Sequence, residues 1–342
     1  NFLPTNGSVF VATDRAGLSA AASSGLPAAF ATNGGPAVIT DGTNLAFTGD
    51  GAIRITASQT GDANWNAAAD LTNTYSVVKA PAAVYLQNLS QVYDGAAKSV
   101  TATTMPAGLA VEFVYDGQGW APTNAGSYAV TGEIHDAIYQ GLATGTLVVA
   151  KGSQAITFPA IADQWTTNAV GLAASANSLL PVAFATNGGP AVITNGTNLT
   201  FTGEGEVRIV ASQAGDDNWN AAPEATNAFN VTKAAAWVYL QNLSQTYDGT
   251  AKSVTATTMP AGLAVEFVYD GNEWAPTNAG SYAVRGTVSD AIYQGGGEGM
   301  LEIARGVQSI VFDPIGGQLT TNKLGLAAAA SSGLPVSFAV GS

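Results

Sequence analysis

The sequence repeats itself at a fixed offset of 154 residues, without insertion or deletion wherever the copies can be followed. The string KSVTATTMPAGLAVEFVYDG begins at Lys98 and again at Lys252, and FATNGGPAVIT begins at Phe30 and again at Phe184. Self-similarity at a fixed period is the signature of an array of structural units that pack mainly on their neighbours. We therefore expect an array rather than a single fold built around one active centre.

Two kinds of unit alternate within this period. We expect long repeats at residues 1–79 and 152–233, short repeats at 80–151 and 234–305, and an incomplete long repeat at 306–342. At each junction a hydrophobic strand end is followed by one basic residue and a few small residues, as in VVKAP, VAKGS, VTKAA and IARGV. Linkers this short leave little freedom between neighbours, so we expect semi-rigid units in a row.

Apolar and polar residues alternate with a period of two in both kinds of repeat. The pattern is clear at Val111, Phe113 and Tyr115 in a short repeat, and at Val207 and Ile209 in a long repeat. This alternation is typical of strands with one buried face, and Asn-Gly and Gly-Gly-Pro turn signals separate the segments. No segment predicts a long amphipathic helix. The expected fold class is therefore all-β, with an antiparallel β-sandwich in each repeat.

The composition excludes several classes of protein. Only 10% of the residues are charged, the net charge is −13, there is no Cys, and His135 is the one histidine. A disulfide framework and a thiolate metal site are therefore excluded. An acidic chain without a basic run is an unsuitable partner for nucleic acid or anionic membranes. No stretch reaches the roughly 20 apolar residues of a membrane span, so we expect no membrane insertion in this segment.

Several strings in the short repeat resemble a known family. These are the Tyr-Asp-Gly at Tyr93 and Tyr247, the TATTMPAGLAVEFVYDG string, and the APTNAGSYAV string at Ala121 and Ala275. They resemble the MBG repeat of very large secreted bacterial surface proteins. The long repeat, with LTFTGEGEVRIVASQAGDDNWNAAP, resembles the bacterial Ig-like repeat that often alternates with it. The resemblance implies a tandem array of Ig-like sandwiches in adhesin stalks at the bacterial cell surface, with no shared catalytic residues.

The Asn-Ala-Gly-Ser-Tyr motif at Tyr128 and Tyr282 has two interpretations. One is a polar binding loop. The other, which we favour, is a tyrosine corner, in which the hydroxyl of a buried Tyr ties a turn to nearby backbone.

A second motif places Asp and Asn at alternate positions, as calcium loops do. It runs through Asp62, Asn64 and Asn66, and recurs at Asp216, Asn218 and Asn220. The loop lacks the central Gly and the Glu at the twelfth position of a calcium loop. Comparison with the Ig-like repeat favours a structural turn instead, with the aromatic residue, Trp65 or Trp219, packed inward.

Trp120 and Trp274 lie in Gly-x-x-Trp-Ala-Pro loops. An exposed indole offers a flat amphipathic surface for a sugar ring, which makes these residues candidates for a glycan site. The alternative, which we favour, is that each indole covers the edge of its own sandwich.

Catalysis has little support in the sequence. A Ser nucleophile needs a partner base, and His135 is replaced by Ser289 in the second copy. Asp94, Asp116 and Asp136 lie in one short repeat, but each is next to turn residues, where Asp is expected for backbone reasons. We expect no enzyme, no cofactor and no catalytic residue.

These observations predict a structural stalk or fibre segment of a large extracellular bacterial protein, giving reach and presentation. Its expected partners are neighbouring units of the same polypeptide or fibre. The alternative is an adhesin module that binds carbohydrate or a host ligand, including cell-surface polysaccharide, through the Trp, Asn and Asp loops. A third hypothesis is an adhesin stiffened by calcium.

The last expectation concerns the apolar side chains of residues 306–342. Half a sandwich cannot bury its apolar face. We expect these side chains to be covered by something outside this sequence, either a longer polypeptide or a neighbouring chain. They are Ile310, Phe312, Leu326, Val336 and Phe338.

Overall fold

The computed structural model describes residues 1–341. In that range every regular element is a β-strand and none is a helix, which confirms the all-β fold class. The chain divides into two compact units. The first comprises residues 1–155, 176–180 and 213–223, and the second comprises the remaining described residues.

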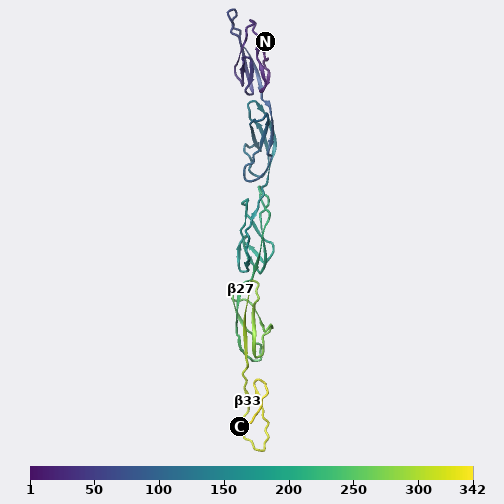
Figure 1. Ribbon diagram of the computed structural model, residues 1–342, viewed down its shortest axis with the longest axis vertical. Coiled ribbons are helices and arrows are strands. Elements are labelled where there is room, and N and C mark those ends of the chain that lie inside the picture. Colours follow the sequence, from purple (N-terminus) through teal and green to yellow (C-terminus); the bar gives the residue numbers. More distant parts are fainter. Residues whose placement is uncertain (342) are drawn as a thin grey trace. The chain divides into compact units, whose positions relative to one another are not determined.

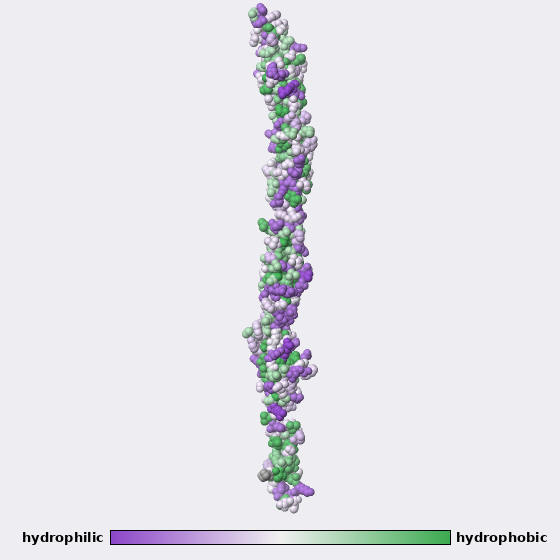
Figure 2. Space-filling view, in the orientation of Figure 1, coloured by the Kyte–Doolittle hydropathy of each residue, from purple (hydrophilic) through white to green (hydrophobic). Residues whose placement is uncertain are grey.

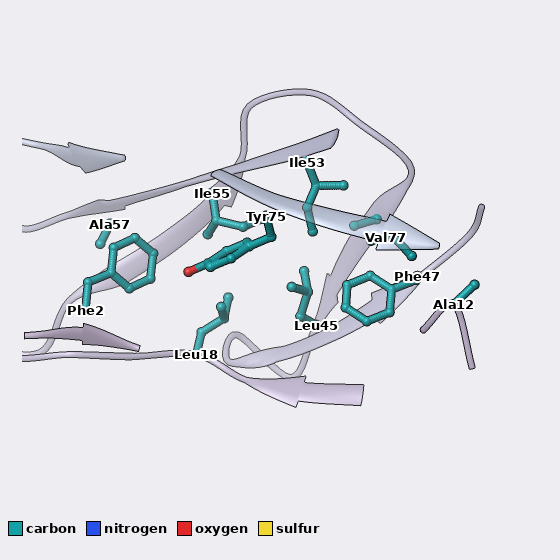
Figure 3. Close-up of a cluster of buried hydrophobic side chains, with 11 residues drawn as sticks. Phe2, Ala12, Leu18, Leu45, Phe47, Ile53, Ile55, Ala57, Tyr75 and Val77 are labelled. Atoms are coloured by element: carbon teal, nitrogen blue, oxygen red, sulfur yellow. The ribbon is translucent and has the colours of Figure 1, made fainter. Parts of the chain in front are cut away.

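The N-terminal part of the first unit is a sandwich of small sheets (Figure 1). Its strands are β1 (Phe2–Leu3), β2 (Val9–Val11), β3 (Arg15–Gly17), β4 (Ser19–Ala20), β5 (Ala29–Thr32), β6 (Ala37–Thr40), β7 (Asn44–Phe47), β8 (Gly51–Ser58) and β9 (Leu71–Val78). They form sheets in the orders β2-β9-β8-β5, β3-β7-β6 and β1-β4. Alternate residues of β8 and β9, namely Ile53, Ile55, Tyr75 and Val77, are buried. Figure 3 shows the Tyr75 ring between Ile55 and Leu18 in this core.

The rest of the strands of the first unit build a second sandwich. They are β10 (Ala80–Pro81), β11 (Ala83–Gln87), β12 (Ser90–Val92), β13 (Thr101–Met105), β14 (Val111–Tyr115), β15 (Gly126–Ile134), β16 (Tyr139–Gln140) and β17 (Leu142–Ala150). A sheet of order β12-β17-β15-β14 is accompanied by the pairs β11-β13 and β10-β16. The core of this sandwich is formed by Val100, Tyr115, Val130, Leu147 and Val149.

The strands between residues 156 and 232 follow the same order as those of residues 1–78. They are β18 (Ile156–Thr157), β19 (Gln164–Trp165), β20 (Ala169–Gly171), β21 (Ser175–Ala176), β22 (Ala183–Thr186), β23 (Ala191–Thr194), β24 (Asn198–Phe201), β25 (Gly205–Ser212) and β26 (Ala225–Thr232). The sheets β19-β26-β25-β22 and β20-β24-β23 enclose a core that includes Leu199, Ile209 and Phe229.

The C-terminal strands of the second unit are arranged differently. They are β27 (Ala234–Gln241), β28 (Ser244–Thr246), β29 (Thr255–Met259), β30 (Val265–Tyr269), β31 (Gly280–Val288), β32 (Tyr293–Ala304), β33 (Ile310–Phe312) and β34 (Ala328–Ala330). One sheet of order β29-β27-β32-β31-β30, with β28 also on β32, holds six of them. β33 pairs only with β34.

The sandwiches also contain parallel strand pairs, which the expectation of antiparallel sandwiches did not include. Most pairs are antiparallel, but several are parallel, among them β2 with β9, β12 with β17, β19 with β26 and β28 with β32. In these four cases a short early strand lies beside the last long strand of the same sandwich. Alternation in a sequence reports which face of a strand is buried, and it carries no information on the neighbouring strand.

The side chains at the C-terminal end of the described chain are largely open to solvent. Ile310, Phe312, Leu326 and Phe338 are exposed, and Val336 is half-buried. Figure 2 shows hydrophobic residues in green gathered over the segment that Figure 1 colours yellow. These side chains are therefore not buried against residues 234–305.

Candidate functional site

The two Tyr residues of the Asn-Ala-Gly-Ser-Tyr motif each bond to backbone. The Tyr128 hydroxyl donates to the Asn124 carbonyl oxygen at 2.9 Å, and the Tyr282 hydroxyl donates to the Asn278 carbonyl oxygen at 3.0 Å. This is the hydrogen bond that a tyrosine corner requires. Both side chains are half-buried, which is less than the expected burial.

A deeper tyrosine contact escaped the sequence analysis. Tyr115 is buried, and its hydroxyl oxygen accepts a hydrogen bond from the Val100 amide at 3.0 Å. Tyr269 and Val254 repeat this contact in the second copy. The residues stand at identical places in both copies, but nothing in their local pattern indicates a hydrogen bond to backbone 15 residues away in the chain.

A lysine after each Tyr-Asp-Gly sequence was also missed. Only 8% of Lys98 is exposed, and its Nζ lies 2.6 Å from Asp94 Oδ1. Lys252 and Asp248 form the same pair at 2.5 Å. The hydrogen bond from Lys98 holds the pKa of Asp94 below its usual value, and Lys252 does the same for Asp248. The apolar stem of each lysine packs in the sandwich while its ammonium group reaches the surface carboxylate.

The other candidate carboxylates are engaged by backbone amides. Asp116 accepts from the Ala129 amide at 2.7 Å. Asp136 accepts from the amides of Ile138 and Tyr139, and these bonds lower its pKa. In the described part of the chain, these carboxylates therefore stabilise turns. His135 is exposed, and its nearest ionic partner is Glu112 at 3.9 Å.

The two Asp-x-Asn-Trp-Asn loops have the same internal bonds. Asp62 Oδ1 accepts from the amides of Asn64 and Trp65, and Asp216 Oδ1 accepts from those of Asn218 and Trp219. No group of three or more His, Cys, Asp or Glu residues within 1–341 is placed to hold a metal ion. The calcium hypothesis for Asp62, Asn64, Asn66, Asp216, Asn218 and Asn220 stays a prediction.

The expectation that the Trp of this loop packs inward is wrong for Trp65, which is 53% exposed. Trp219 is half-buried, but it packs on the preceding short repeat rather than in the core of its own sandwich. The loop folds through the Asp side chain and backbone, so it projects its indole away from the sandwich.

The remaining candidates, Trp120 and Trp274, are 70% and 75% exposed. A cavity of about 360 Å³ lies beside Trp274, lined also by Asp270, Asn272 and Asn278. An open indole next to amide and carboxylate groups can stack on a sugar ring and bond to its hydroxyls. No helix in residues 1–341 is long and apolar enough to cross a membrane.

Comparison with known proteins identifies part of the chain. Residues 82–153 and 236–307 match the family described as the MBG domain. The chain therefore contains two MBG domains, separated by one β-sandwich of a different kind. No curated protein matches the chain.

Solved structures with tandem domains also align with it. The four N-terminal Ig domains of Dscam1 isoform 6.9 share 14% identity at a TM-score of 0.26, covering 90% of this chain and 99% of that one. Drosophila N-cadherin EC1-4 shares 10% at 0.25, covering 89% and 99%. Bacteroides ovatus SGBP-B, solved in complex with a mixed-linkage heptasaccharide, shares 15% at 0.17, covering 67% and 69%. At such low TM-scores these likenesses carry no argument about function.

Proposed function

We propose that this chain is a structural segment of a bacterial surface stalk or fibre, whose work is reach and presentation outside the cell. Its units are the long repeats 1–79 and 152–233, the MBG repeats 80–151 and 234–305, and the partial long repeat 306–342. All strand pairs of the described residues lie inside one of these ranges, which supports the boundaries.

The observation that carries the proposal is that two of the junctions between repeats have no spacer. β9 ends at Val78 and β10 begins at Ala80, so Lys79 alone separates two sandwiches; Lys233 alone separates β26 from β27. The Lys233 ammonium donates to the Asp290 carbonyl oxygen at 2.7 Å, which pins the linker to the following domain. A one-residue linker under such restraint transmits force and direction between sandwiches, as a stalk must.

Small-angle X-ray scattering of the chain tests this proposal. Sandwiches joined by one-residue linkers are expected to give a particle whose maximum dimension is several times its thickness. A compact particle would contradict the stalk function. Insertion of a Gly-Ser linker after Lys79 and Lys233 is the matched comparison, and it is expected to broaden the distribution of interatomic distances.

The chemistry of the carboxylates supports a role without catalysis. Asp94 is paired with Lys98, and Asp116 and Asp136 cap backbone amides, so these groups already hold turns in place. Alternation of two different sandwiches also separates like sequences, which reduces strand exchange between neighbours during folding.

The second candidate function is binding of a glycan. The observation that favours it is the exposed Trp274 beside the cavity lined by Asp270, Asn272 and Asn278. Glycan-array binding by the intact chain, with Trp274→Ala and Trp120→Ala as variants, tests it. Binding that both substitutions abolish supports a lectin-like role. An array without signal contradicts glycan binding and agrees with a stalk function only.

A further inference from the structure

The loop Gln213–Asn220 is docked by backbone hydrogen bonds on the C-terminal end of the first MBG match, residues 82–153. The Gly152 amide donates to the Asn218 carbonyl oxygen, and the Asn220 amide donates to the Gly152 carbonyl oxygen, both at 2.9 Å. Lys151 Nζ donates to the Asp216 carbonyl oxygen at 2.5 Å. The loop therefore pairs with Lys151 and Gly152 almost as a strand would.

Side chains of the same loop bond to a second segment of that domain. Asn218 Oδ1 accepts from the Ala125 amide at 2.8 Å, and Asn218 Nδ2 donates to Asn124 Oδ1 at 3.3 Å. Asn220 Nδ2 donates to the Lys151 carbonyl oxygen at 3.2 Å. Each Asn of the Asp-x-Asn-Trp-Asn motif thus has a partner on the MBG domain.

The indole of Trp219 completes this contact. Its ring lies edge-on to the Tyr93 ring, with the centroids 5.2 Å apart. A Cβ on Gly152 would come within 2.7 Å of both the Trp219 ring and the Tyr93 carbonyl oxygen. Only glycine allows this approach. Gly152 and the Tyr93 ring therefore form the surface on which the Trp219 indole packs.

The loop Gln59–Asn66 shares six of its eight residues with the docked loop but makes none of these contacts. Asp62 and Trp65 hold the loop in the same form through Asp62 Oδ1 and the Trp65 carbonyl oxygen. Among residues 1–341, the side chains of Asn64 and Asn66 make no hydrogen bond, and Trp65 is 53% exposed. The loop is therefore formed in advance, with its docking groups unused.

A cavity also lies beside this loop. In the docked copy, Gln154 Nε2 donates to the Gln213 side chain and to the Asn220 carbonyl oxygen. In the first copy a cavity of about 140 Å³ is lined by Asn1, Ser58 and Gln59, where Gln59 corresponds to Gln213. The space and the amide acceptor for a glutamine side chain are both present.

We propose that the Gln59–Asn66 loop and the cavity beside it form a docking site for the C-terminal end of an MBG-type domain. The partner presents a Tyr ring, an Asn-Ala turn, and a Lys or Arg followed by Gly, with a Gln two residues later. The second MBG domain has this set as Tyr247, Asn278, Arg305, Gly306 and Gln308. This goes beyond a stalk function, since it gives the Gln59–Asn66 loop a specific partner.

A second copy of this chain is a poor occupant, although its second MBG domain carries these residues. Gly306 continues directly into residues 309–342, which hold the same place in the repeat as residues 1–34. If the second MBG domain of another copy docked with the geometry seen at Trp219, residues 309–342 of that copy and residues 1–34 of this chain would occupy the same space. The partner is therefore an MBG-type end that has no long repeat of its own in that position.

The test extends the full chain by duplicating residues 80–154 in front of Asn1, which preserves the period because Asn1 corresponds to Ala155. Hydrogen–deuterium exchange then reports the Asn66 amide, which corresponds to the bonded Asn220 amide. In the original chain Asn66 is expected to exchange fast. In the extended chain its exchange is expected to slow by at least about tenfold, toward that of Asn220 in the same molecule.

Matched variants make this result specific. Trp65→Ala, and Gly→Val at the added glycine equivalent to Gly152, are each expected to remove the new protection. Trp120→Ala removes another exposed indole, away from this loop, and is expected to leave the protection intact. An unprotected Asn66 in the extended chain beside a protected Asn220 would overturn the proposal. Concentration-dependent association of the original chain, abolished by Trp65→Ala, would assign the loop to a second copy and overturn it as well.

Discussion

The two MBG domains share long stretches of identical sequence, yet their sheets are joined differently. In the domain of residues 82–153, β11 pairs with β13 apart from the sheet that contains β17. In the domain of residues 236–307, β27 and β32 pair and merge the corresponding strands into one sheet. The difference in strand pairing must therefore come from the few positions at which the two sequences differ.

Glycine at three successive positions explains the difference. The second domain has Gly295, Gly296 and Gly297 where the first has Gly141, Leu142 and Ala143. A Cβ on Gly297 would lie 2.2 Å from the Val238 carbonyl oxygen, a distance that backbone does not tolerate. The first domain carries that Cβ on Ala143, so its strands must stand further apart. Close approach of two backbones is a recognised role of glycine in sheets.

The largest expected effect comes from removing this close approach. Gly297→Ala is expected to cost about 2–3 kcal/mol of unfolding free energy, the upper part of the range for overpacking. It is also expected to separate β27 from β32, which hydrogen exchange of residues 234–237 measures. Ala143→Gly in the first domain is the matched control and should cost about 1 kcal/mol through chain entropy alone. Equal costs for the two variants would contradict the glycine explanation.

The buried tyrosines test a feature that the two domains share. Tyr115→Phe leaves the Val100 amide without its partner inside the core, which is expected to cost about 1–2 kcal/mol. Tyr269→Phe should cost the same in the second domain, because the contact has the same length. Chemical denaturation of each variant gives the cost. A clear difference between the two would show that sheet joining alters the core as well as the edge.

The tyrosine corners are expected to matter less. Tyr128 and Tyr282 are half-buried, so water can replace the lost partner in Tyr128→Phe. We expect a cost of about 1 kcal/mol or less, the net contribution of one hydrogen bond. A loss as large as that of Tyr115→Phe would make the corner a main determinant of the fold.

The sequence allowed the strands to be predicted, but not which strands pair with one another in a sheet. Alternation at Val111, Phe113 and Tyr115 correctly indicated a strand with one buried face. Nothing in that pattern reports that Ala143 and Gly297 set the distance to another strand, because this distance depends on backbones far apart in the chain. Trp65 and Trp219 make the same point, since identical motifs differ in burial according to what lies against them.

The smallest expected effect concerns acid, and it again separates the domains. Lys98 lowers the pKa of Asp94, and Lys252 lowers that of Asp248, where the Thr250 hydroxyl also donates to Oδ1 at 2.6 Å. Ala96 stands in place of Thr250 in the first domain.

Because the folded pKa of each carboxyl lies below its unfolded value of 3.8, its stabilisation is complete above that value and is lost as pH falls through the folded pKa. The first domain should therefore lose its ion pair at a higher pH than the second. Carbon-detected NMR titration of the two carboxyl groups measures this order. Thr250→Ala is expected to raise the pKa of Asp248 toward that of Asp94. If the two carboxyls titrate together before the substitution, the extra hydroxyl contributes nothing, and the ion pair alone sets both pKa values.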